Sequence, residues 1–236
     1  MTLERPLTGG IIAAGDGRRL RDDGWTVPKP LVPVAGVPLL GVVVGNFLAA
    51  GIMPVTIIVN EREGECVEWG RARFPGVDLR FIVQTTASSL ESFARVAAAD
   101  LPGAMLISAV DAWCRPADFA RFVVSARRRP PAAMVLAITP LVADEKPLWV
   151  TVGAGGRVMG LGGASGDAVT AGLYLIPESL RRRRPPEGLG RLREYLAWLV
   201  DQGEPVYAET IETVVDVDRS SDVVLAESLA HVARST

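Results

Sequence analysis

The chain has 236 residues, of which 49% are apolar and 22% are charged, and this composition excludes intrinsic disorder over most of its length. The length fits one large α/β domain, and the formal net charge of −2 argues against a general nucleic-acid binder. Two cysteines, Cys66 and Cys114, indicate no disulfide framework and favour a reducing compartment. No signal-peptide pattern and no apolar stretch of membrane-spanning length are present, so we expect a cytoplasmic protein without a membrane partner.

The first part of the chain alternates short apolar runs, which predict strands, with longer amphipathic or polar segments, which predict helices. The expected strands are Leu7–Ala13, Val55–Val59, Leu79–Val83, Met105–Ser108 and Met134–Thr139. The expected helices are Leu39–Ala50, Glu61–Phe74, Ser88–Ala99 and Pro116–Arg128. This alternation predicts parallel strands that are joined by crossover helices.

The pattern changes after residue 140. A glycine-rich turn between two apolar runs predicts a hairpin, and the segments after it are a long strand, a helix, two short strands and a closing helix. These elements are Trp149–Val152, Arg157–Leu161, Ala168–Ile176, Leu189–Gln202, Val206–Ala208, Thr213–Val217 and Ser220–Val232. The sequence therefore predicts an α/β fold whose first half is mainly parallel and whose second half is partly antiparallel.

The strongest chemical signal follows the first strand. Gly15 and Gly17 allow backbone N–H groups to approach a phosphate closely, and Arg18 and Arg19 add guanidinium donors. Lys29 lies between two prolines, so its ammonium group is held on a stiff backbone. Neither the Rossmann glycine fingerprint nor the Walker loop fits this segment.

The same segment resembles the signature of nucleotidyltransferases that make nucleoside-diphosphate sugars and alcohols. The matching residues are Ile11-Ile-Ala-Ala-Gly15-Asp-Gly17-Arg-Arg19-Leu20, followed by Pro28-Lys29-Pro30-Leu31 and Val32-Pro-Val-Ala-Gly36-Val-Pro38-Leu39. The resemblance implies a Rossmann-like mixed sheet, mainly parallel, with helices on both faces. It also implies a single domain over residues 1–236, with a nucleotide-binding half at about 1–140 and an acceptor-binding half at about 141–236.

Site residues follow from the resemblance. Arg19 is expected on the phosphates of a nucleoside triphosphate, and Lys29 is expected to neutralise the reacting phosphoryl group. Base and ribose contacts are expected from Gln84, Thr85 and Ser89, although a simple helix cap explains this segment equally well. The remaining nucleotide-binding residues are expected to be Ala13, Ala14, Gly15, Asp16, Gly17 and Arg18.

Three aspartates are candidate metal ligands. Asp111 directly follows an apolar strand, at the sheet edge where ligands bind in α/β proteins. Asp216 and Asp218 belong to an Asp-Val-Asp segment that resembles the acidic segment near the C-terminus of the family, and in an extended chain both point to one face. We expect Asp111 to hold Mg²⁺ with either Asp216 or Asp218, while Asp222 is expected to cap the last helix.

The resemblance implies transfer of a nucleoside monophosphate from an NTP to a sugar-1-phosphate, with release of pyrophosphate. Two alternatives stay open: a cytidylyltransferase that acts on a non-sugar alcohol phosphate or phosphonate, and a catalytically silent, nucleotide-sensing subunit. The expected partners are thus an NTP and a phosphorylated sugar or small alcohol, without nucleic acid. A homodimer is left open.

Overall fold

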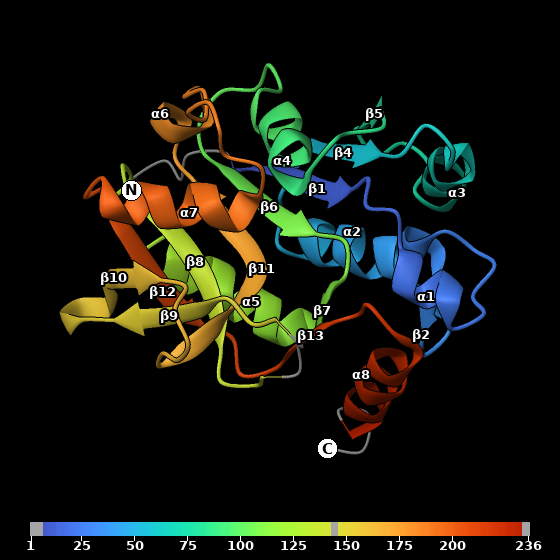
Figure 1. Ribbon diagram of the computed structural model, residues 1–236. Coiled ribbons are helices and arrows are strands. Elements are labelled where there is room, and N and C mark those ends of the chain that lie inside the picture. The colour runs from blue at the N-terminus through green and yellow to red at the C-terminus, as the bar shows by residue number, and fades with distance from the viewer. Residues whose placement is uncertain (1–6, 143–145, 233–236) are drawn as a thin grey trace.

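One twisted sheet of nine strands runs through the molecule (Figure 1). The computed structural model describes residues 7–142 and 146–232. The strands of this sheet are β1 (Thr8–Ala13), β4 (Val55–Val59), β5 (Leu79–Val83), β6 (Met105–Ala109), β8 (Met134–Thr139), β9 (Trp149–Val152), β10 (Val158–Leu161), β11 (Ala168–Ile176) and β12 (Val206–Thr210).

The order of the strands explains how the two halves of the chain meet. Seven strands follow the order β10-β9-β11-β6-β1-β4-β5, while β8 pairs with β11 and β12 pairs with β8. Strands β6, β1, β4 and β5 pair in parallel, whereas β11 runs antiparallel to both β6 and β8. The predicted mixed, mainly parallel α/β fold with a partly antiparallel second half is therefore confirmed.

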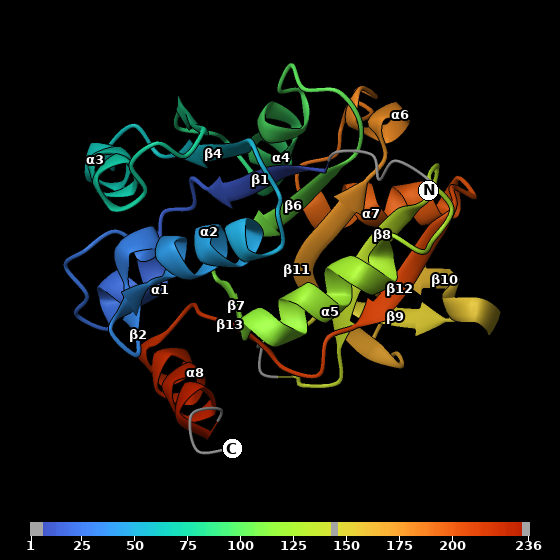
Figure 2. The same ribbon diagram turned by 180° about the vertical axis from the view of Figure 1, so that it is seen from behind.

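Helices cover both faces of the sheet (Figures 1 and 2). In the view of Figure 1, α4 and α7 lie on the near face, while α2 and α5 lie on the far face, which Figure 2 turns toward the viewer. The longer helices are α2 (Leu39–Ala49), α3 (Gly64–Arg73), α4 (Ser89–Ala97), α5 (Pro116–Ala126), α7 (Leu192–Asp201) and α8 (Ser220–Val232). Within the described residues no helix is both long enough and apolar enough to cross a membrane.

The hydrophobic core is divided by the sheet into two layers. Neighbouring residues of a strand point to opposite faces, so buried Ile57 packs into the layer of α2 and α5, and buried Ile58 packs into the layer of α4 and α7. In the first layer the ring of Phe47 meets that of Phe119, with their centroids 5.4 Å apart. The apolar runs are thus buried on both faces, which is typical of strands that are covered by crossover helices.

Two helices begin later than the sequence predicts. The Asn60 side chain accepts the N–H of Arg62, and this local turn keeps residues 60–62 out of α3. The Glu194 carboxylate accepts the N–H groups of Gly190 and Arg191, so α7 begins only at Leu192. In both cases a side-chain oxygen accepts a backbone N–H group just before the first turn of the helix.

Several short elements were not predicted, because two to five residues carry no readable period. They are α1 (Arg18–Asp22), the 3-10 turn η1 (Lys29–Leu31), β2 (Pro33–Val34), β3 (Val37–Pro38), β7 (Ala112–Cys114), the 3-10 turn η2 (Ala154–Gly156) and α6 (Glu178–Arg181). The short strand expected at Thr213–Val217 is present as β13 (Val214–Asp216). Residues of α1, η1, β7 and β13 belong to the site or lie beside it.

Candidate functional site

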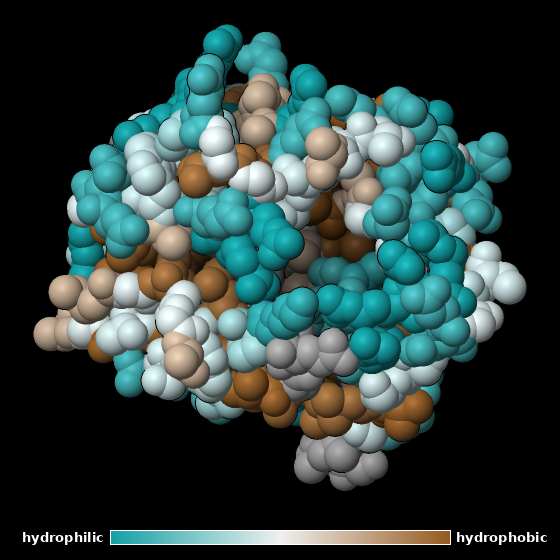
Figure 3. All heavy atoms as spheres, viewed as in Figure 1, coloured by the Kyte–Doolittle hydropathy of each residue, from teal (hydrophilic) through white to brown (hydrophobic). Residues whose placement is uncertain are grey.

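A cleft of about 580 Å³ opens at the carboxyl ends of β1 and β6, and Figure 3 shows the hollow between polar rims. Its walls come from both halves of the chain, since β1 and β6 are joined there by β11, α4 and α7. Ligands of open α/β sheets bind at this edge. The residues that line it and that the sequence singles out are Ala13, Ala14, Gly15, Asp16, Gly17, Arg18, Arg19, Lys29, Ser89, Asp111, Asp216 and Asp218.

The loop after β1 turns sharply under the cleft. Gly17 has φ +57°, a left-handed conformation, and a Cβ atom at this position would lie 2.8 Å from the Cβ of Lys29. A side chain at position 17 is therefore unfavourable for two reasons, the left-handed backbone conformation and the close approach of η1. The turn ends at Arg18, where α1 begins, and the close approach of Gly17 packs the loop against Lys29 although the two are separate in sequence.

The Lys29 side chain is only 8% exposed, and its ammonium group donates hydrogen bonds to Asp111 and Asp218. Arg19 donates to the other oxygen of the Asp218 carboxylate. Burial alone would lower the pKa of Lys29, but the carboxylates of Asp111, Asp218 and Asp216 outweigh it and raise that pKa well above 10.5. Lys29 is therefore a permanently charged group at the floor of the cleft.

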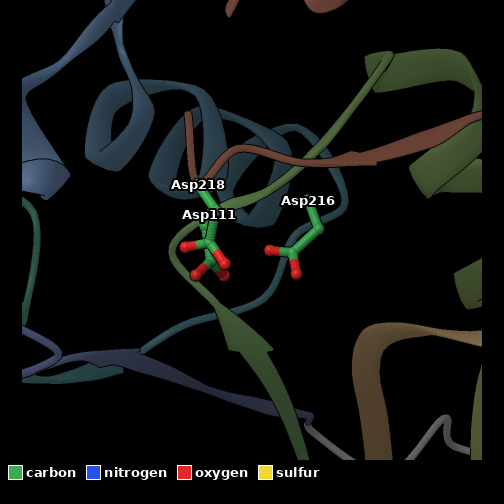
Figure 4. Close-up of side chains that lie close together, drawn as sticks. All are labelled: Asp111, Asp216 and Asp218. Carbon is green, nitrogen blue, oxygen red and sulfur yellow. The ribbon is translucent and has the colours of Figure 1, made fainter. Parts of the chain in front are cut away.

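Three carboxylates lie close together beside this ammonium group, and Figure 4 shows their side chains, those of Asp111, Asp216 and Asp218. Asp111, Asp216 and Asp218 each offer an oxygen within 4.8 Å of the others. Strand pairing brings them together: β13 pairs with β7, which places Asp216 opposite Ala112, and the N–H of Val217 donates to the carbonyl of Asp111 at 3.0 Å. A set of carboxylate oxygens at this spacing fits a divalent cation that prefers oxygen ligands.

The start of α8 fixes one of these aspartates. The Asp222 carboxylate accepts the N–H groups of Asp218 and Arg219 at 2.9 and 2.7 Å, in agreement with the predicted cap. The Trp25 indole N–H also donates to Ser220, which ties this turn to the loop after α1. The C-terminal segment is thus anchored on both sides of Asp218.

The residues expected at the base and ribose do not all reach the cleft. Ser89 lines it, and its hydroxyl accepts the N–H of Leu192 at 3.2 Å. Gln84 and Thr85 do not line it, and Thr85 instead donates to Asn60. Thr86, the next residue in the chain, does line the cleft, so the boundary of the cleft falls between Thr85 and Thr86.

Other polar side chains line the cleft without having been singled out from the sequence. Thr86 and Ser92 share a hydrogen bond of 2.6 Å, and both line the cleft with Ser89. They lie in or next to the segment that contains Gln84, so the sequence pattern could have indicated them as well as Gln84. Tyr174 and Arg193 line the opposite part of the cleft, on β11 and α7. Both lie inside ordinary strand and helix patterns, so no sequence signal marks them.

Known proteins share this architecture. A solved structure, the inositol-1-phosphate CTP transferase from T. maritima, superposes with a TM-score of 0.81 at 18% identity, over 96% of this chain and 97% of that one. A CMP-5'-(3-aminopropyl)phosphonate synthase from Streptomyces rubellomurinus is 30% identical over 207 residues, which cover 81% of this chain and 32% of that protein. A bifunctional IPC transferase and DIPP synthase from Rubrobacter xylanophilus is 30% identical over 234 residues, which cover 93% of this chain and 51% of that protein.

The chain therefore spans about a third and about a half of the length of these two relatives. The sequence profile of the MobA-like NTP transferase domain matches residues 9–168, which is more than half of the chain. The matched region includes the glycine–arginine loop, Lys29 and Asp111. This chain belongs to the MobA-like NTP transferase domain family.

Proposed function

We propose that this protein is a Mg²⁺-dependent nucleotidyltransferase that joins an NTP, CTP by preference, to an alcohol phosphate or a phosphonate and releases pyrophosphate. The support lies above all in one arrangement, the Lys29 ammonium between the carboxylates of Asp111 and Asp218. The Gly15–Arg19 loop adjoins it and would hold the triphosphate through backbone N–H groups and the Arg19 guanidinium. A fixed cation beside a phosphate cradle suits phosphoryl chemistry.

The reaction needs no nucleophilic side chain, because the acceptor oxygen is already ionised. That oxygen attacks the α-phosphorus and forms a new P–O bond. The bond from the α-phosphorus to the oxygen that bridges the α- and β-phosphates breaks, and pyrophosphate leaves with the electron pair. Lys29 offsets charge on the reacting group, and the loop orients the triphosphate, so catalysis here is positioning and electrostatic stabilisation.

Asp111, Asp216 and Asp218 are the residues that would hold Mg²⁺. When bound, the ion supplies positive charge that offsets the charge of the phosphates. Asp218 is also the partner of both Arg19 and Lys29, so it would keep these two cations aligned with the phosphates.

The choice of acceptor rests on the relatives that match most of this chain. One is named for a phosphonate and CMP, and another for inositol 1-phosphate and CTP, while a third similar structure is named for glucose 1-phosphate. We therefore place an alcohol phosphate or phosphonate first and a sugar-1-phosphate second. A silent, nucleotide-sensing subunit is less consistent with a cleft that keeps Arg19, Lys29 and Asp111 together.

The test is pyrophosphate release with each of the four common NTPs across a panel of acceptors. The panel contains (3-aminopropyl)phosphonate, inositol 1-phosphate and glucose 1-phosphate. Release is expected with CTP and one of the first two acceptors, and it should be lost in Asp111→Asn. The control Asp201→Asn changes an exposed carboxylate at the end of α7, outside the cleft, and should leave release intact. CTP binding without release from any acceptor would favour the silent subunit.

A further inference from the structure

The cationic side chains that line the cleft come from two sides of Asp111. Arg18, Arg19 and Lys29 lie on the β1 side, where the triphosphate would be bound. On the β11 side, among the described residues, Arg193 is the one cationic side chain that lines the cleft. An acceptor that carries a phosphate or phosphonate must meet the α-phosphorus opposite the leaving pyrophosphate. It would therefore enter from the side where Arg193 lies.

Tyr174 lies on β11 and lines the cleft together with Arg193 and the aspartates. Gly172 has φ +71° and interrupts the regular pairing of β11 with β8, because the register shifts between Thr170 and Tyr174. A Cβ atom on Gly172 would lie 3.0 Å from the Cβ of Ala112, the residue after Asp111. This irregularity brings β11 close to the end of β6, beside the acidic cluster.

Among the residues that the structure describes, none forms a hydrogen bond with the Tyr174 hydroxyl. The side chain is nevertheless only 7% exposed. The fully buried polar atoms that lack a partner include the hydroxyl of Tyr195 but not that of Tyr174, so the Tyr174 hydroxyl reaches the open space of the cleft. Burial and the charges of Asp111 and Asp216 raise the pKa of Tyr174, and the hydroxyl therefore keeps its proton to donate.

Arg193 faces the same space. Its positive charge opposes part of the rise in the pKa of Tyr174. One N–H of Arg193 donates to the carbonyl of Lys146 at 3.2 Å, and this contact holds the side chain across from the segment before β9. Among the described residues the other guanidinium N–H groups have no acceptor, so they are available to a ligand.

We propose that the Tyr174 hydroxyl and the Arg193 guanidinium hold the phosphate or phosphonate group of the acceptor. This inference rests on the proposed function and deepens it, because it assigns the recognition of the second substrate to two residues. Tyr174 donates one hydrogen bond to an anionic oxygen, and Arg193 adds a charged donor from α7. The acceptor anion is thereby held against the repulsion of Asp111 and Asp216 and can approach a second anion, the triphosphate.

The test compares Tyr174→Phe and Arg193→Gln with wild type in steady-state kinetics. CTP is the donor, and (3-aminopropyl)phosphonate and inositol 1-phosphate are the acceptors. A lost hydrogen bond to a charged group predicts an increase of about 10-fold to 100-fold in the KM for the acceptor in each variant. The Kd for CTP, measured by calorimetry without acceptor, should stay unchanged, because neither residue lies on the triphosphate side.

The matched controls are Tyr207→Phe and Arg182→Gln. Tyr207 lies on β12 under two arginine side chains and Arg182 forms a surface pair with Glu178, both outside the cleft, so both variants should keep the acceptor KM of wild type. The inference is overturned if wild type turns over an acceptor and Tyr174→Phe and Arg193→Gln do so with unchanged KM. It is also overturned if the Kd for CTP rises as much as the acceptor KM. If wild type turns over neither acceptor, the proposed function itself has failed.

Discussion

The substitution Lys29→Met removes the ammonium group from the acidic cluster and keeps an apolar side chain of similar length. Lys29 is 8% exposed, and its two partners, Asp111 and Asp218, are 23% and 28% exposed. After the substitution these carboxylates and Asp216 would face one another with oxygens within 4.8 Å and without the compensating charge. We therefore expect effects on stability, on metal binding and on turnover.

The effect on stability follows from the exposure of the partners. Loss of one member of a fully buried ion pair costs about 3–5 kcal/mol. Since water reaches Asp111 and Asp218 in part, we expect the free energy of unfolding to fall by about 1–3 kcal/mol in urea denaturation without metal. The control Arg182→Met removes the cation of an exposed pair with Glu178, and it should cost less than about 1 kcal/mol.

Metal should reverse this loss. The ammonium of Lys29 occupies the space between two of the carboxylates, so its removal lets a divalent cation bind there without displacing a protein cation. Mn²⁺ should therefore stabilise Lys29→Met more than it stabilises wild type when no nucleotide is present. Turnover should fall by about 10²-fold to 10³-fold even with saturating metal, because the charge on the reacting phosphoryl group is no longer offset. Unchanged stability, an unchanged response to Mn²⁺ and full turnover would together refute this role of Lys29.

Two further predictions concern the loop and its surroundings. Gly17→Ala should lower the free energy of unfolding by about 1–2 kcal/mol, because φ is +57° and the new methyl group meets Lys29. Gly15→Ala should leave that free energy nearly unchanged, because its Cβ would meet no atom within 4 Å. Equal denaturation midpoints for the two variants would contradict this prediction. Burial raises the pKa of Glu63 from 4.5 to about 7, so the Glu63 carboxyl loses its proton at a lower pH in the unfolded chain than in the folded one. The free energy of unfolding should therefore decrease by up to about 3 kcal/mol as the pH rises from 4.5 to about 7. Glu63→Gln should flatten this decrease in urea denaturation at several pH values, and a slope equal to that of wild type would speak against it.

The long elements of the fold could be predicted because their patterns are local. The β-branched run Val55–Val59 and the Ser88 cap with Glu91 give β4 and α4 at nearly the expected residues. By contrast, β7 has three residues and exists through its pairing with β13, about a hundred positions later, so no local pattern marks it. Elements that depend on distant pairing are therefore the ones the sequence leaves out.

The candidate site divides in the same way. Lys29 and Asp111 lie in recognisable segments, and the fold brings them into contact. Gln84 and Thr85 were expected near the base because they follow a strand, but Thr86 and Ser89 line the cleft in their place. Which residues of such a loop face the cleft depends on how the loop folds, and the sequence does not show this. Tyr174 lines the cleft from β11, whose pairing with β8 shifts between Thr170 and Tyr174, and the apolar pattern of the strand does not reveal such a shift.

The central claim is that the glycine–arginine loop, Lys29 and the three aspartates converge on one metal-bound triphosphate. A crystal structure with Mn²⁺ and a CTP analogue that has a non-hydrolysable α,β-bridge tests this directly, since Mn²⁺ gives an anomalous signal. We predict an anomalous peak within about 2–2.5 Å of carboxylate oxygens from Asp111 and from Asp216 or Asp218, with the α-phosphate beside Lys29. A nucleotide bound away from Lys29, or a metal peak that none of these aspartates contacts, would contradict the account.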